Sequence, residues 1–359
     1  MAGQVSPGVV IKERDLTNAR IDSTVDNVGA LVGPFERGPV NEMVNITNEK
    51  SLLEYFGKPN DNNAGYWFTA TNFLSYGGQL QVVRVGDSNL KNAVTDAASA
   101  VLIESDTDYT TNHFDGAQGF HYGAKYAGSY GNNITVHVID HGYDFDVTVD
   151  AAVTAVAGTT VYQSNGVTGK LFAAASAGTA LKVFETNGQV VAGSSNLLLQ
   201  QTGATSTALN GDIAAGAASI TVASATGIAT GEYLIINNSE IVKVTDTASA
   251  PALTVDRAQF GTTAVSATDA ASVIELTAVS ISASTKWWDT VSLGDTGINW
   301  NTLVSRPGTS SFASNYSSKY DELSIVVLDA TGLISGTKNT VLEKFQNLSK
   351  SADSQSAEG

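Results

Sequence analysis

Residues 28–85 read VGALVGPFERGPVNEMVNITNEKSLLEYFGKPNDNNAGYWFTATNFLSYGGQLQVVRV, and this stretch decides the fold class. Its two ends are short apolar runs of the kind that form buried strands. The run over 80–85 is so apolar that we expect both of its faces to be covered. Between the ends, apolar residues recur at helical spacing before Gly57 and Gly77, and glycine is typical of a helix end. The pattern predicts strands over 28–33, 40–46 and 80–85, and helices over 47–56 and 64–76.

The end of the chain repeats these patterns. Residues 323–328 (LSIVVL) form another buried-strand pattern. Thr340 and Glu343 fit a capping box, in which each side chain bonds the backbone amide of the other residue, so a helix is predicted to begin there. The apolar residues of its face would be Val341, Phe345 and Leu348. Strands and helices in this order predict a mixed α/β domain built from both ends of the chain.

The middle of the chain, residues 87–285, differs in composition from both ends. It holds eighteen acids and six bases, and therefore most of the net charge of −16. Short alternating runs between Gly, Asn and Asp residues are typical of antiparallel β structure, and Asn237-Asn238 fits a hairpin turn. These runs lie at 134–139, 143–149, 159–162, 181–185, 219–222, 233–236, 241–245 and 253–255.

Together these patterns predict an α+β multidomain protein. A mixed α/β core domain is interrupted by a long β-rich insertion, which forms outer domains of antiparallel β-barrel or sandwich type. The expected parts are an N-terminal arm (1–21), the core domain (22–86 plus 286–359), an outer domain (87–209 plus 276–285) and a small β module inserted in that domain (210–275).

Composition excludes several classes of function. A net charge of −16 argues against direct binding of nucleic acid or of an anionic membrane, since both require a basic face. The sequence has no cysteine, so disulfides, thiolate metal sites and cysteine nucleophiles are absent. We find neither an apolar secretory signal pattern nor an apolar run of about 20 residues that could span a bilayer.

One histidine cluster could suggest a metal site. His137 and His141 lie four residues apart, with Asp140, Asp144 and Asp146 nearby. The segment has a strand and turn pattern, in which alternate side chains face opposite sides, so exposed polar residues of a β surface are the better interpretation. No metal site is predicted.

Two motifs resemble catalytic or phosphate-binding patterns without completing them. Ser129 lies in AGSYG, close to a nucleophile elbow, but a β pattern follows it instead of a helix, and no histidine follows His141. The segment over 166–171 lacks the first glycine and the hydroxyl residue of a phosphate-binding loop. The sequence therefore predicts no catalytic residue, no cofactor and no enzymatic activity.

The N-terminal arm indicates assembly with other chains. Val9, Val10, Ile11, Lys12 and Glu13 form a short strand pattern with no local hairpin partner. Such a strand leaves backbone donors and acceptors open, so it can join a sheet of its own domain or add to the edge of a neighbour. The sequence alone leaves both alternatives open.

From this arm onward, several blocks of the sequence resemble a known protein family. The blocks SPGVVIKERDLTN, VGALVGPFERGPVNEMVNIT, FGKPNDNNAGYWFTATNFLSYGGQLQVVRV, AKYAGSYGNNITVHV and SIVVLDATGLISGTKNTVLEKFQNLSKSAD are similar, in this order, to the tail sheath proteins of contractile-tailed bacteriophages of the T-even-like myovirus type. They cover about half of the chain. In relatives the chain continues past the last block, so we expect this chain to be incomplete, with the tube contact in the missing part.

The resemblance implies a structural role in the virion. Subunits would be assembled in the host cytoplasm, stack as hexameric rings around the tail tube and contract to drive the tube through the host envelope. Implied partners are other copies of the chain, the tail tube protein, and the baseplate and tail terminator proteins, with no direct contact to nucleic acid or membrane. The residues Val9–Glu13 would be the strand exchanged between subunits, and the acidic insertion would face outward.

Two alternatives remain. The chain could be the sheath of a related contractile injection machine, such as a tailocin or a type VI-like apparatus. It could also be a β-rich glycan-binding or adhesion protein, since carbohydrate sites combine exposed aromatic rings with carboxylates. The best residues for such a site are Tyr143, Asp144 and Asp146.

Overall fold

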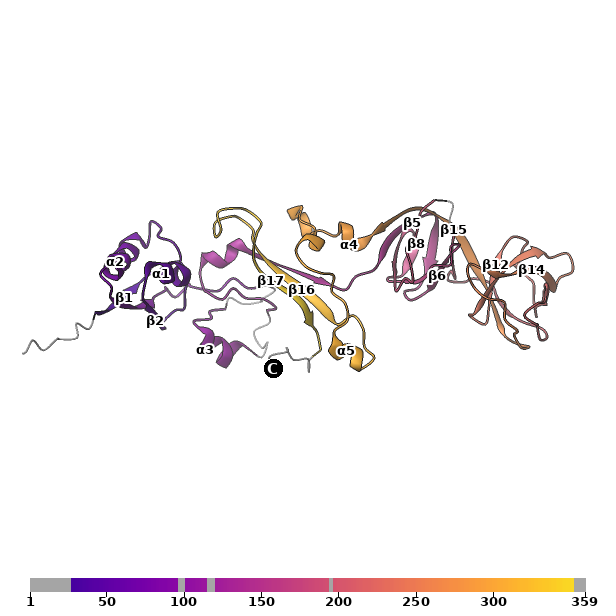
Figure 1. Cartoon of the computed structure of the whole chain (residues 1–359), viewed down its shortest axis with the longest axis horizontal. Coiled ribbons are helices and arrows are strands. Elements are labelled where there is room, and N and C mark those ends of the chain that lie inside the picture. The colour runs from indigo at the N-terminus through magenta and orange to yellow at the C-terminus, as the bar shows by residue number, and fades with distance from the viewer. Residues whose placement is uncertain (1–26, 96–100, 115–119, 194–195, 352–359) are drawn as a thin grey trace, which may run out of the picture. The chain divides into compact units, whose positions relative to one another are not determined.

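The computed structural model describes residues 27–95, 101–114, 120–193 and 196–351, which belong to two compact units. The first unit consists of the described parts of Met1–Val136 and Val327–Leu342, and the second of those of His137–Val326 and Glu343–Gly359. Strands predominate and a few short helices accompany them (Figure 1). The domain boundaries expected from the sequence stay predictions.

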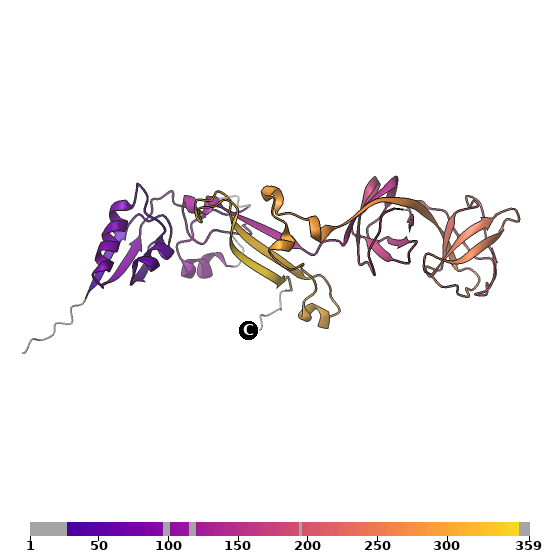
Figure 2. The same cartoon turned by 45° about the horizontal axis from the view of Figure 1, so that its top comes forward.

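The first unit is built around a three-stranded sheet in the order β1-β3-β2, in which β1 runs parallel and β2 antiparallel to β3. Its helices α1 and α2 lie beside this sheet (Figure 2). The elements of the chain up to residue 133 are β1 (Val28–Gly33), β2 (Met43–Ile46), α1 (Glu49–Phe56), α2 (Ala64–Ser75), β3 (Gln79–Arg84), α3 (Asp106–Asp108), η1 (Tyr109–His113) and η2 (Ser129–Asn133).

Local residue chemistry explains where α1 begins and ends. The side chain of Asn48 accepts a hydrogen bond from the Ser51 amide at 2.8 Å, which satisfies one of the free donors of the first turn. Gly57 ends the helix with a φ of 82°, a conformation that favours glycine. The indole of Trp67 on α2 donates to the Gly57 carbonyl at 3.0 Å and so fixes the two helices together. Both helices predicted from the sequence are confirmed.

The helices cover only one face of this sheet. Leu80 and Val82 of β3 are buried in one cluster with Leu52 and Phe56 of α1 and with the inner side chains of α2. On the opposite face, Val32 is 56% exposed. The expectation that both faces of strand 80–85 are covered is therefore wrong for the unit by itself, since the second face is largely exposed at Val32 and Met43.

The second unit contains most of the antiparallel β structure. One large sheet joins the strands from β5 to β15. The elements are β5 (Phe145–Ala155), β6 (Thr160–Gln163), β7 (Thr168–Leu171), β8 (Ala175–Phe184), β9 (Asn196–Leu199), β10 (Ser206–Ala208), β11 (Ser219–Thr221), β12 (Tyr233–Ile236), β13 (Glu240–Asp246), β14 (Ala252–Gln259), β15 (Ser272–Lys286), α4 (Trp287–Thr290), η3 (Gly294–Thr296), η4 (Trp300–Thr302) and α5 (Ser311–Asn315).

Two large hydrophobic clusters lie along this sheet, together with a smaller one that includes Leu198, Ile235 and Leu276. The first contains inward-facing residues of β5 to β9, and the second lies between Leu209 and Val273. The long strand β15 serves both, because its first part pairs with β10 and β12 and its later part with β9 and β5. The second cluster falls almost wholly within the stretch 210–275 that the sequence singles out as a module.

The hairpin predicted at Asn237-Asn238 is confirmed. Both residues have positive φ angles, 47° and 52°, which suit a tight turn whose twist matches the flanking strands. The turn joins β12 and β13, which pair antiparallel from Tyr233 opposite Lys243 to Ile236 opposite Glu240.

A third sheet has the order β17-β16-β4, and its residues are divided between the two units. Its strands are β4 (Ile134–Asp140), β16 (Glu322–Asp329) and β17 (Thr340–Ser349). The strands expected at 134–139 and 323–328 are thus confirmed.

The helix predicted to begin at Thr340 is wrong, because this stretch forms the strand β17. The Thr340 hydroxyl donates to the Thr337 carbonyl at 2.8 Å instead of capping a helix. Asn339, with a φ of 62°, precedes the strand, and the Asn347 amide donates to the Ser324 hydroxyl of β16. Pairing with β16 therefore outweighs the local helix pattern.

Candidate interaction surfaces

The residues predicted to exchange between subunits, Val9, Val10, Ile11, Lys12 and Glu13, lie outside the described residues. Their role stays a prediction. The described chain begins at Asn27, directly before β1.

The uncovered face of that sheet is a candidate assembly surface. Val32, Val83 and Met43 stand in one row across the three strands, because Val32 is opposite Val83 and Val83 is opposite Met43. Val32 and Met43 are each 56% exposed. A row of exposed apolar side chains on a sheet face is typical of a surface that contacts another protein segment.

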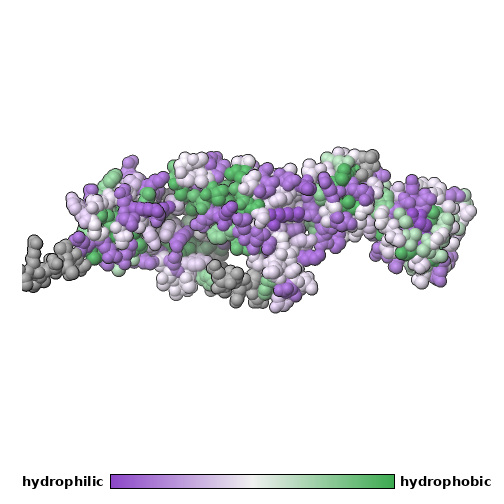
Figure 3. Space-filling view, viewed as in Figure 1, coloured by the Kyte–Doolittle hydropathy of each residue, from purple (hydrophilic) through white to green (hydrophobic). Residues whose placement is uncertain are grey.

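A second apolar surface lies around β16 and β17, where the space-filling view shows apolar residues gathered (Figure 3). Within the second unit, Phe345 and Leu348 of β17 are exposed, and Leu323 and Ile325 of β16 are half-buried. This exposed apolar surface also suits contact with protein.

Buried Arg84 gives the first unit an internal anchor. Its guanidinium donates to the carbonyls of Phe35 at 2.8 Å, Gly38 at 2.9 Å, Glu36 at 3.1 Å and Ala127 at 2.8 Å. Burial lowers the pKa of Arg84 to about 10, so the side chain stays protonated at neutral pH. One cation therefore holds the loop after β1 and a distant part of the chain against the end of β3.

The side chains of the predicted histidine cluster bind different partners. The Asp140 carboxylate pairs with Lys350, and the Asp144 carboxylate with Arg306. His141 stacks on Tyr320 with ring centroids 3.8 Å apart, and burial lowers the pKa of His141. Within the described ranges, no three His, Asp or Glu side chains are placed to hold a metal ion.

The first motif-like segment forms a short helical turn, and the second runs from a turn into the strand β7. Ser129 begins the short helical turn η2 and follows Gly128, whose φ is 120°, with no strand directly before it. Gly166 has a φ of 84° and lies between β6 and β7, which pair as a hairpin. The β pattern expected after Ser129 is confirmed by β4, which begins at Ile134.

The residues named for a glycan site are partly brought together. The Tyr143 ring lies 5.3 Å from the Trp287 ring and 5.6 Å from that of Phe172, in an aromatic cluster. Burial and a hydrogen bond to Asp146 raise the pKa of Tyr143 to about 12. Asp144 instead lines a hollow that sequence reasoning did not identify.

Buried Asp329 organises the loop between β16 and β17. Its carboxylate accepts hydrogen bonds from the amides of Gly332 at 2.7 Å, Ile334 at 2.9 Å and Ser335 at 2.7 Å, and from the Ser335 hydroxyl at 2.9 Å. Burial alone would raise the pKa of this carboxyl. The hydrogen bonds outweigh it and lower the pKa from 3.8 to about 2.

Asp329 should make the stability of the fold depend on pH in the acidic range. A lowered pKa in the folded state means that the contribution of Asp329 is complete above about pH 4 and is lost as the pH falls towards about 2. Thermal melting between pH 5 and pH 2 should therefore show a steeper fall for the natural protein than for Asp329→Asn. The exposed Asp61→Asn is the matched control, and an equal fall in Asp329→Asn and the natural protein would contradict this role.

Open apolar sheet faces and internally bonded polar groups are typical of a structural protein that assembles with other chains. Comparison with known proteins finds similarity to structural proteins of phage tails. Residues 28–85 match a family described as "Tail sheath protein Gp18 domain III N-terminal region". The match contains the whole β1-β3-β2 sheet with its two helices, and it ends one residue after Arg84.

Three similar proteins are each named tail sheath protein. That of Vibrio phage KVP40 is 39% identical over 97 residues, 27% of this chain and 14% of the relative. That of Salmonella phage ViI is 36% identical over 137 residues, which are 38% of this chain and 21% of the relative. That of Enterobacteria phage T4 is 31% identical over 172 residues, which are 48% of this chain and 23% of the relative.

These matches confirm the resemblance to the tail sheath proteins of T-even-like phages, and with it the expected location in the tail of a virion. The chain spans less than a quarter of the length of each of these relatives in the matched segments. No helix among the described residues is both long and apolar enough to cross a membrane.

Proposed function

We propose that the chain is part of a subunit of a contractile phage tail sheath, which stacks as hexameric rings around the tail tube. The sheath contracts to drive the tube through the host envelope during genome delivery. The observation that supports this most is the match of residues 28–85, because it coincides with a complete sheet and its covering helices. The proposed role is structural and includes no catalytic step.

The proposed partners follow from this role. Other copies of the chain and the tail tube protein would be the main contacts, and the baseplate and tail terminator proteins would contact the ends of the sheath. The open face with Val32, Val83 and Met43 suits burial against a neighbouring copy, since its apolar row is continuous across the sheet. A tailocin or type VI-like sheath is less favoured, because the three relatives are phage proteins.

Negative-stain electron microscopy of the protein expressed from its complete gene tests the proposal. Striated hollow tubes, alone or around tail tubes, are the expected result. Discrete particles at every concentration would contradict the proposed assembly.

The proposed arm is tested by adding charge to it. Changing Val9, Val10 and Ile11 together to Asp should reduce the number of tubes to roughly a tenth or less. Strand addition depends on several backbone hydrogen bonds worth about 1 kcal/mol each, together with side-chain pockets. The count of tubes per field of view, at equal protein concentration, is the measurement.

A matched control places the same three negative charges outside the strand pattern, by changing Thr17, Asn18 and Ala19 to Asp. This variant should form tubes in normal number. Normal tubes from the variant at Val9, Val10 and Ile11 would reject strand exchange by the arm while leaving the sheath assignment intact.

A further inference from the structure

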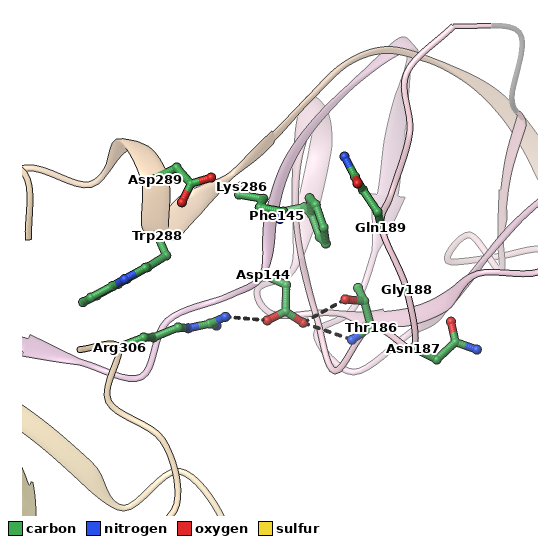
Figure 4. A pocket seen from close by; sticks show the side chains of 10 residues that line it. All are labelled: Asp144, Phe145, Thr186, Asn187, Gly188, Gln189, Lys286, Trp288, Asp289 and Arg306. Carbon is green, nitrogen blue, oxygen red and sulfur yellow. Dashed lines mark hydrogen bonds and ion pairs between the residues drawn. The ribbon is translucent and has the colours of Figure 1, made fainter. Parts of the chain in front are cut away.

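The second unit contains a hollow of about 590 Å³ that the sheath role does not require (Figure 4). One wall comes from the end of β15 and the start of α4, with Lys286, Trp288 and Asp289. The opposite wall is the loop after β8, which includes Gln189, and the carboxylate of Asp144 lies between the two walls.

The floor of the hollow is fixed and electrically balanced. Asp144 pairs with Arg306 at 2.9 Å and accepts hydrogen bonds from the Thr186 amide at 3.0 Å and hydroxyl at 3.1 Å. Arg306 also donates to the Tyr143 carbonyl at 3.1 Å. Because these charges satisfy each other, the floor presents a rigid polar surface without a strong net charge.

The walls carry polar groups that have no partner in the described part of the chain. Lys286, Asp289 and Gln189 make no side-chain hydrogen bond or ion pair there. They supply an ammonium donor, a carboxylate acceptor and an amide that can do both. The opposite charges of Lys286 and Asp289 again leave the hollow close to neutral.

Trp288 adds a half-buried aromatic surface at the same place. Its ring lies 5.8 Å from that of Trp287, which contacts Tyr143 at 5.3 Å and lies 5.8 Å from the Arg306 guanidinium. The neighbouring cluster therefore positions the Trp288 indole beside the polar groups of the walls. A ring that is apolar on one side and can donate a hydrogen bond at its edge suits an amphipathic ligand.

We propose that this hollow binds an uncharged saccharide. A sugar ring offers an apolar face for stacking on Trp288, and its hydroxyls both donate and accept, as the mixed groups of the walls require. The balanced charges of the hollow give an anionic ligand no excess of cations to bind, and the net charge of −16 on the chain opposes polyanions. This site goes beyond the sheath proposal and does not depend on it.

Saturation-transfer-difference NMR of the natural protein tests the site with three probes. These are chitotriose and maltotriose, which are uncharged, and 3′-sialyllactose, which is anionic. We expect ring-proton signals from at least one uncharged probe, with a dissociation constant of about 1 mM for one open site. Trp288→Ala should weaken this binding roughly tenfold, the contribution of one aromatic contact.

Matched variants separate binding from folding. Tyr316→Ala removes another exposed aromatic ring of the same unit and should leave binding unchanged. Asp289→Asn and Gln189→Ala alter exposed or partly exposed side chains without removing core contacts, and each should weaken binding several-fold. Silence from both uncharged probes, signals from 3′-sialyllactose alone, or equal losses in Trp288→Ala and Tyr316→Ala would each overturn the proposal.

Discussion

Replacing Arg257 with leucine should lower the free energy of unfolding of the module between Leu209 and Val273 by about 3 to 5 kcal/mol. The Arg257 guanidinium donates two 2.6 Å hydrogen bonds to the Glu240 carboxylate, whose side chain is 1% exposed. Leucine removes the only cation paired with this buried acid among the described residues. Urea unfolding of the whole chain, followed by circular dichroism, measures the change.

The surrounding contacts explain why the effect should be large. Glu240 also accepts hydrogen bonds from the amides of Ala258 and Val265, and Arg257 donates to the carbonyls of Ala214, Ala217 and Val265. Burial alone would raise the pKa of Glu240. The hydrogen bonds from Arg257, Val265 and Ala258 lower it below its ordinary value. The pair therefore ties two loops to the strands β13 and β14.

An exposed ion pair of the same unit provides the control. Lys170 lies 2.7 Å from Glu185, but its side chain is 47% exposed. Lys170→Leu should change the free energy of unfolding far less than Arg257→Leu does, because water and salt screen such exposed pairs. If Arg257→Leu and Lys170→Leu lowered the free energy of unfolding equally, the burial of the Arg257–Glu240 pair would not increase its contribution to stability.

Local sequence patterns predicted those elements whose partners lie close by in the chain. The strand at 233–236 and its hairpin at Asn237-Asn238 have the expected place, since turn chemistry and alternation agree there. The helix expected at Thr340 is wrong because pairing with β16 outweighs the helical spacing of Val341, Phe345 and Leu348. The long strand β15 was not predicted, since it serves two cores that no single window of sequence shows.

The candidate sites likewise differ in whether their residues are neighbours in the sequence. The arm at Val9–Glu13 was identified from its sequence pattern and its resemblance to a family, and it stays a prediction. The hollow beside Trp288 could not be found in this way. Its groups come from residues as far apart as Asp144 and Arg306, and only the folded chain brings them together. Asp144 was named as a glycan candidate, but its neighbours Gln189 and Lys286 carried no signal.

The side chain of Arg84 leads to the second prediction with a large effect. Arg84→Met should lower the free energy of unfolding of the first unit by about 3 kcal/mol, because four carbonyls lose a charged donor and methionine cannot replace it. Arg84 is only 3% exposed, so water cannot easily take the place of the guanidinium. Arg84→Lys should retain part of the stability, since an ammonium keeps the charge but cannot reach all four acceptors.

Arg37→Met is the matched control for this anchor. Arg37 is half-buried and donates to the Tyr130 hydroxyl and the Leu53 carbonyl, so its loss should cost about 1 kcal/mol. Hydrogen exchange gives a sharper measurement. In Arg84→Met the amides around Phe35 and Gly38 and those near Ala127 should lose protection together, because one guanidinium holds both segments. If only one segment lost protection, the hydrogen bonds of Arg84 to the other segment would contribute nothing to its stability. Residues other than Arg84 would then join the loop after β1 to the chain around Ala127.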